Sequence, residues 1–324
     1  MPMRTVLLSL LLMIALLNAG EAREVASVAA SVKGTLFDQA GTAVAKVATN
    51  HGGLRTTVRN YTSASVFVPA IARGQVDFGV ANQFEITLAL EGEGYFAGRE
   101  QSNLRAVAVL FPLQTAMFVR QDSPYQRIAD LEDQRLPDGF VANKIAIPLL
   151  DALLASDGLT RSDVIAFNVP GLVAGVDAFL AGRTEAFILA LRAPKVREAD
   201  ARHGVRVLPI ENTPEKLAAI RRHMPVAYLA LESPSPGSTG LAGPTWVMTY
   251  DTLLFASAET SAETVYQMTR ALYANKQNLV DASPAFRGFS EDRMVKDLGT
   301  LEYHSGAIRF YTERGLWPST KQQD

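Results

Sequence analysis

Apolar and polar positions follow two different periods along most of this chain. Short apolar or alternating runs are typical of strands, and apolar residues three and four positions apart are typical of helices. From Val25 to Ala81 these runs come in the order strand, helix, strand, helix, strand. This alternation predicts an α/β fold in which a mainly parallel sheet is flanked by helices and the loops gather at one edge.

The runs also give approximate element boundaries. The predicted strands cover 25–32, 55–61, 76–81, 104–110, 115–120, 164–169, 185–191, 205–210 and 246–256. The predicted helices cover 43–48, 66–71, 84–90, 145–156, 173–181, 194–203, 264–279 and 303–314.

The alternating pattern starts afresh after Asp122, which predicts a second unit of the same type. About 300 residues exceed what one small core usually organises, so two lobes are expected. We expect crossings between the lobes near Arg120 and near Thr249. Lobe I then comprises residues 23–120 and 249–324, and lobe II comprises residues 121–248.

The first 22 residues have the pattern of an export signal. Arg4 is followed by an unbroken apolar run from Val6 to Leu17, and small residues precede the expected cleavage near Ala22. The run is too short to anchor the chain in a bilayer. With no cysteine anywhere, the exported chain is expected to have neither disulfides nor a thiol nucleophile.

Charge and residue spacing exclude several classes of function. The formal net charge of −2 argues against nucleic acid as a partner, because no clustered basic face is indicated. The histidines stand far apart, so neither a metal site nor a hydrolase triad is expected. No nucleotide-binding glycine motif is present, and no cofactor is expected.

A glycine-bearing loop between the first strand and the first helix is a candidate anion site. The first N–H groups of a helix have no partner within it, so Gly34, Thr35, Leu36 and Phe37 can present backbone donors to an anion. The alternative is that the glycines only shape the turn. Similar loops after the next strands favour the first interpretation.

Several segments resemble the TAXI family of TRAP-transporter solute-binding proteins. Residues 34–41 resemble that family's GTYYPLGG loop, 62–66 its TGGSVEN segment, 72–82 its SGEADLGFVQ stretch, 120–131 its RADS and SLADLKGKR pairing, and 182–187 its GKIDAFF segment. The resemblance extends over nearly the whole chain after residue 22. It implies a periplasmic binding protein whose two α/β lobes, joined by two hinge strands, close on a small anionic solute and deliver it to membrane permease subunits.

Four departures from the family pattern concern the ligand. Leu36 and Phe37 replace an aromatic pair and offer no phenol hydroxyl, and residues 62–65 replace a glycine pair. Asn82 is one methylene shorter than the family's glutamine, and residues 137–144 stand where the family has a GSGT turn. The solute is therefore expected to be a dicarboxylate, an amino acid or a related organic acid, with the specificity left open.

Further candidate ligand-binding residues lie where strands end and helices begin. Lys144 and Arg192 are candidate cations for a carboxylate, with a solvated lysine and a surface ion pair as the alternatives. Phe140 is a candidate wall residue or a core residue. The polar and small candidates, which could instead cap helices, are Thr62, Ser63, Ala64, Ser65, Asn82 and Asn143.

Two other classes of function remain open at this point. One is a sensor that passes ligand occupancy to a membrane kinase. The other is an enzyme on the same two-lobe fold, although the sequence offers no paired nucleophile and base.

Overall fold

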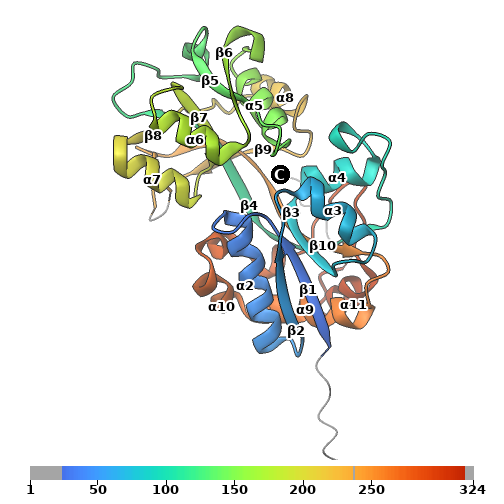
Figure 1. The fold of residues 1–324 in the computed structure, drawn as a ribbon. Helices are drawn as coiled ribbons and strands as arrows, with labels where there is room; N and C mark the ends of the chain where they lie inside the picture. The colour runs from blue at the N-terminus through green and yellow to red at the C-terminus, as the bar shows by residue number, and fades with distance from the viewer. Residues whose placement is uncertain (1–23, 236–237, 318–324) are drawn as a thin grey trace, which may run out of the picture.

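The computed structural model of the chain describes residues 24–235 and 238–317. The predicted export signal and the last seven residues lie outside this part. Figure 1 shows two α/β parts connected by long strands that pass from one part to the other. We keep the names lobe I and lobe II for them, and the lobe boundaries near Arg120 and Thr249 stay predictions.

The elements follow the predicted alternation. The strands are β1 (Val25–Ala30), β2 (Arg55–Asn60), β3 (Phe78–Asn82), β4 (Leu104–Arg120), β5 (Arg135–Gly139), β6 (Ile165–Val169), β7 (Ala186–Ala190), β8 (Val205–Val207), β9 (Tyr228–Glu232) and β10 (Thr245–Ser257). The α-helices are α2 (Leu36–His51), α3 (Ala64–Ala72), α4 (Gln83–Glu91), α5 (Ala146–Ala155), α6 (Leu172–Leu180), α7 (Pro194–His203), α8 (Pro214–Arg221), α9 (Ala262–Ala274), α10 (Lys276–Ala282) and α11 (Ser305–Glu313). Short 3₁₀ turns include η4 (Pro284–Gly288).

The main sheet is mixed, whereas a mainly parallel sheet was expected in each lobe. Its path is β2-β1-β3-β10-β4-β7, with β8 added to β4 and β9 added to β10. β1 is parallel to β2 and β3, but β10 is antiparallel to β3, β4 and β9. The late strand β10 inserts between two earlier strands, and this distant pairing makes the sheet mixed.

Two predicted boundaries are wrong for local reasons. The runs 104–110 and 115–120 form the single strand β4, which continues through Pro112. β7 joins β4 only from Thr115, so Pro112 has a strand partner on one side alone and its missing N–H is tolerated. The predicted helix 264–279 is divided at Asn275 into α9 and α10.

The first helix starts earlier than its apolar spacing predicts. α2 begins at Leu36, since the Thr35 side chain caps it by accepting a hydrogen bond from the Asp38 N–H. Leu36 and Phe37 therefore belong to the first helical turn and not to the loop. Both side chains pack against the core of lobe I, and Leu36 is buried.

Helices cover both faces of the sheet in lobe I. α2 packs on β1 and β2 and against α9 and α10, while α3 and α4 pack on β3 and β10. A separate apolar cluster includes Phe118 of β4 and Phe187 of β7, whose rings stack with centroids 4.9 Å apart. No helix in the described part of the chain is long and apolar enough to cross a membrane.

Candidate functional site

The strand register makes the loop-bearing edges of the two lobes face each other. β3 runs in the same direction as β4, and its last residue, Asn82, is level with Thr252 of β10 and Phe111 of β4. β7 runs against β4, and its last residue, Ala190, pairs with Thr115. Four residue steps of β4, about 13 Å at strand rise, therefore separate the two edges.

The other parallel strands end at the same two edges. β1 and β2 are in register with Ala30 opposite Asn60, so the loops that follow them lie beside Asn82 on lobe I. In lobe II the Glu185 N–H donates to the Arg135 carbonyl, which aligns the starts of β7 and β5. Ligands of open α/β sheets bind outside such carboxyl edges.

The first loop of lobe I is held by hydrogen bonds within the chain. The Gly34 N–H donates to Asp38 Oδ2 at 2.8 Å, and Asn60 Nδ2 donates to Asp38 Oδ1 at 2.6 Å. Gly34 has a φ of 83°, a conformation that favours glycine. Thr35 caps α2. Asp38 therefore occupies one of the backbone donors that the sequence assigned to an anion.

The second loop is partly free. Ser63 and Ser65 share a hydrogen bond between their hydroxyls at 2.8 Å, and neither hydroxyl caps α3. Thr62 is exposed, whereas Ser63 and Ala64 are buried. Of this predicted set, Thr62 is the residue most accessible to a solute.

Asn82 at the third loop caps the start of α4. Its Oδ1 accepts from the Glu85 N–H at 2.9 Å, and its Nδ2 donates to Glu85 Oε2 at 2.6 Å. The Tyr95 hydroxyl donates to Glu85 Oε1 at 2.7 Å. Burial raises the pKa of the Glu85 carboxyl to about 7, although these hydrogen bonds favour the charged form.

The facing edge of lobe II contains three predicted site residues in different environments. Phe140 is completely buried and has a φ of 42°, so it is a core residue and the predicted alternative of a cleft wall is wrong. Asn143 is half-buried, and its N–H donates to the Phe140 carbonyl. Lys144 is exposed and forms no ion pair with a described residue.

Arg192 follows β7 and lies at the base of the space between the edges. Its Nη1 donates to Gln114 Oε1 of β4 at 2.8 Å, and its Nη2 forms an ion pair with Glu232 at the end of β9. Its side chain retains 24% of its exposure. The two contacts fix the guanidinium in place and leave other N–H groups for a ligand.

A cavity of about 540 Å³ adjoins this guanidinium. Leu36 contributes from lobe I, Ala190 and Arg192 contribute from lobe II, and the floor is the stretch of β4 between the two edges. The remaining lining residues are Phe111, Pro112, Leu113, Gln114, Glu232, Ser235, Ala285, Arg287 and Gly288. The structure thus brings together Leu36 and Arg192, which are 156 positions apart, while the other predicted site residues do not line this cavity.

Four polar residues of the cavity were missed in the sequence: Gln114, Glu232, Ser235 and Arg287. Gln114 and Glu232 lie on strands that pair with β7 or β10, so no local motif marks them. The cavity is lined by the guanidinium groups of Arg192 and Arg287 and by the carboxylate of Glu232, which pairs with Arg192. This composition suits the binding of a small anion.

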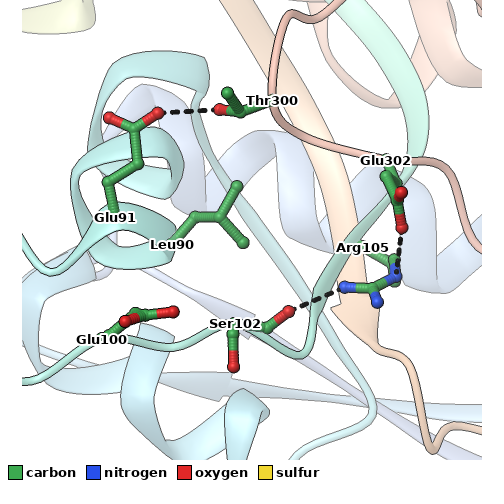
Figure 2. Close-up of a pocket in the computed structure, with 7 residues that line it drawn as sticks. All are labelled: Leu90, Glu91, Glu100, Ser102, Arg105, Thr300 and Glu302. Atoms are coloured by element: carbon green, nitrogen blue, oxygen red, sulfur yellow. Dashed lines mark hydrogen bonds and ion pairs between the residues drawn. The ribbon is translucent and has the colours of Figure 1, made fainter.

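A second hollow of about 420 Å³ lies on lobe I, away from the facing edges (Figure 2). Glu91 accepts a hydrogen bond from Thr300 at 2.8 Å, and Arg105 is paired with Glu302 at 3.5 Å. With three carboxylates and one guanidinium, this hollow is negatively charged and does not suit an anion. Among the described residues no group of three or more acidic or histidine side chains is arranged to hold a metal ion.

The fold is shared with proteins of known structure, one of which is a solute-binding protein. A TctC solute-binding protein from Polaromonas has 14% sequence identity over 84% of this chain and 91% of that chain, with a TM-score of 0.52. A protein from Bordetella bronchiseptica RB50 has 14% identity over 90% and 98%, with a TM-score of 0.51. The periplasmic aliphatic sulphonate binding protein SsuA from Escherichia coli has 14% identity over 93% and 94%, with a TM-score of 0.49.

The two similarities with TM-scores above 0.5 confirm the predicted α/β fold. A sequence model of the NMT1-like family matches residues 28–315, which is most of the chain and includes both facing edges and the cavity between them. The chain therefore belongs to the NMT1-like family.

Proposed function

We propose that this chain is the solute-binding subunit of a TAXI-type TRAP transporter. In this proposal the chain is exported to the periplasm, its leader is cleaved near Ala22, and it delivers a small carboxylate-bearing solute to a membrane permease. The order of the TAXI-like segments along the sequence supports the type of transporter. The family match and the similarity to a TctC solute-binding protein support solute binding without catalysis.

The cavity at Arg192 is the observation that carries the proposal. Its volume lies within the range of small-molecule sites, roughly 300–1,000 Å³. It is lined by both lobes and by a strand that connects them, so a solute there contacts parts that can move relative to each other. A carboxylate can accept charge-assisted hydrogen bonds from the N–H groups of Arg192 that its contacts with Gln114 and Glu232 leave available.

In this proposal, solute binding changes the conformation of the protein by closing the two lobes. β4 and β10 connect the lobes, and each is continuous through the stretch between the two edges. A solute that contacts both edges binds the closed arrangement better and shifts the population towards it. A permease can then distinguish the occupied protein from the empty one by shape.

Thermal unfolding of the purified protein with a panel of organic acids tests this function. We expect one or more carboxylates to raise the melting temperature in a concentration-dependent manner, because a ligand that binds only the folded state stabilises it. The corresponding primary amides are the matched controls and should have no effect. Equal effects of acids and amides, or no effect of any acid across mono-, di- and amino acids, would contradict the proposal.

A further inference from the structure

Exposed valines gather at the two facing edges of the lobes. The described part of the chain has seven large hydrophobic side chains that are exposed, and four of them lie at these edges. Those four are Val32, Val66, Val141 and Val173. Each lobe contributes two of them, from the loops or first helical turns that follow its parallel strands.

Hydrogen bonds between neighbouring loops bring the two valine-bearing segments of each lobe together. In lobe I the Tyr61 N–H donates to the Ala30 carbonyl at 2.9 Å, which joins the segments that carry Val32 and Val66. In lobe II the Ala142 N–H donates to the Pro170 carbonyl at 2.9 Å.

That second bond places the segment of Val141, which is 77% exposed, beside the start of α6 and Val173. Each edge therefore carries two exposed valines on neighbouring segments.

The charges at these edges are cationic. Lys33 is next to Val32, and Lys144 follows Val141 by three positions, both exposed. The carboxylates of Asp38 and Asp138 are already bound, the first by Gly34 and Asn60 and the second by Arg161. An occupant that suits both features is anionic at one end and apolar along its body.

We propose that the solute is an amphipathic monocarboxylate with a branched aliphatic or aromatic body. This inference rests on the proposed function and specifies its substrate class. The carboxylate binds at Arg192, and the body is enclosed by the valines of both lobes when they close. A dicarboxylate or a zwitterionic amino acid would place a second charge among these valines, and burying a charged group there costs more free energy than burying an aliphatic or aromatic body.

Calorimetric titration of the full-length mature protein with straight-chain and branched monocarboxylates of two to eight carbons tests the proposal. Each methylene buried between the edges should tighten binding by up to about fourfold, from the usual free energy of burying a CH₂ group. Phenylacetate should bind more tightly than acetate, and succinate and glutamate should bind more weakly than a monoacid with as many carbons.

A double variant on lobe II and a single variant on lobe I locate the apolar contact. Val141→Ser with Val173→Ser should reduce the affinity for hexanoate at least tenfold and leave that for acetate within twofold. The matched control is Ile165→Ser, which changes a side chain that is 53% exposed at the far end of β6 and should leave both affinities unchanged. On lobe I, Val66→Ser is the test variant and should also weaken hexanoate binding. Val25→Ser, at the start of β1, is its control and should leave the affinity unchanged.

The outcomes separate this inference from the proposed function. Binding of dicarboxylates with no gain from longer monocarboxylates, or with hexanoate affinity unchanged in the valine variants, would overturn the inference and leave the solute-binding function standing. Failure of every carboxylate to bind would overturn both.

Discussion

Asn82 and Glu85 are joined by two hydrogen bonds at the start of α4, one through the Glu85 N–H and one through its carboxylate. The amide that the sequence marks as a ligand donor is therefore occupied by a neighbouring carboxyl group. The carboxyl is buried and also accepts from the Tyr95 hydroxyl. The hydrogen bonds among Asn82, Glu85 and Tyr95 fix the third loop of lobe I at the edge that faces lobe II.

The first prediction concerns the pH dependence of stability. Burial raises the Glu85 pKa from 4.5 to about 7 in the folded state, so between these values the folded protein binds more protons than the unfolded chain. The contribution of Glu85 to the free energy of unfolding is therefore most favourable below pH 4.5 and is lost as the pH rises through 7. Glu85→Gln should remove this loss, which is on the order of 3 kcal/mol at most, and be more stable than the natural protein at pH 8.

Urea unfolding at pH 5, 6, 7 and 8 measures the difference between the two proteins. The exposed Glu100→Gln is the control and should run parallel to the natural protein. A constant difference between Glu85→Gln and the natural protein across this pH range would show that Glu85 is not the titrating group.

The second prediction separates the two roles of Arg192. Arg192→Gln should weaken carboxylate binding at least tenfold, because it removes the guanidinium from the cavity. It should also lower stability by about 1–3 kcal/mol, since the side chain of Glu232 is only 14% exposed and loses its partner.

The double variant Arg192→Gln with Glu232→Gln is the matched test, by calorimetry and urea unfolding. It should regain most of the lost stability and none of the lost affinity. Recovery of both would mean that Arg192 has a structural role only.

Local patterns were sufficient for most elements and for the loops at the facing edge of lobe I. The strand ending at Asn82 and the helix after it follow from an apolar run and a polar cap, both local in sequence. The Asn82 and Glu85 pair also has a sequence signal, because an acidic residue three positions after an N-cap is typical of a capping box. That spacing would have identified Asn82 as a cap.

Distant pairings account for what the sequence did not predict. Arg192 contacts Gln114 and Glu232, which are 78 and 40 positions away, and these contacts depend on how β7 and β9 are placed in the sheet. The mixed sheet arises because β10 inserts between β3 and β4. The pattern of apolar residues within a strand does not predict which other strands it will pair with.

The third prediction concerns Phe140, which the sequence left open as wall or core. Phe140→Ala should lower the free energy of unfolding by about 3–5 kcal/mol, the usual cost of truncating a fully buried aromatic side chain. Phe37→Ala is the comparison, and its loss should be smaller because Phe37 is half-buried at the start of α2. Urea unfolding measures both, and an unchanged stability of Phe140→Ala would contradict its placement in the core.

The fourth prediction concerns Lys144, an exposed lysine at the edge of lobe II without an ion pair to any described residue. If it attracts the anion across solvent, Lys144→Gln should slow carboxylate association about twofold to fivefold at low ionic strength and have little effect at 0.5 M salt, because salt screens charges that are not in contact. Stability should be unchanged, since no folded-state interaction is removed.

Stopped-flow fluorescence at two ionic strengths measures the rates, with Lys46→Gln, an exposed lysine within α2, as the control. An effect of Lys144→Gln that persists at high salt would instead place the ammonium in direct contact with the solute, and no effect at either salt concentration would identify it as a solvated surface residue.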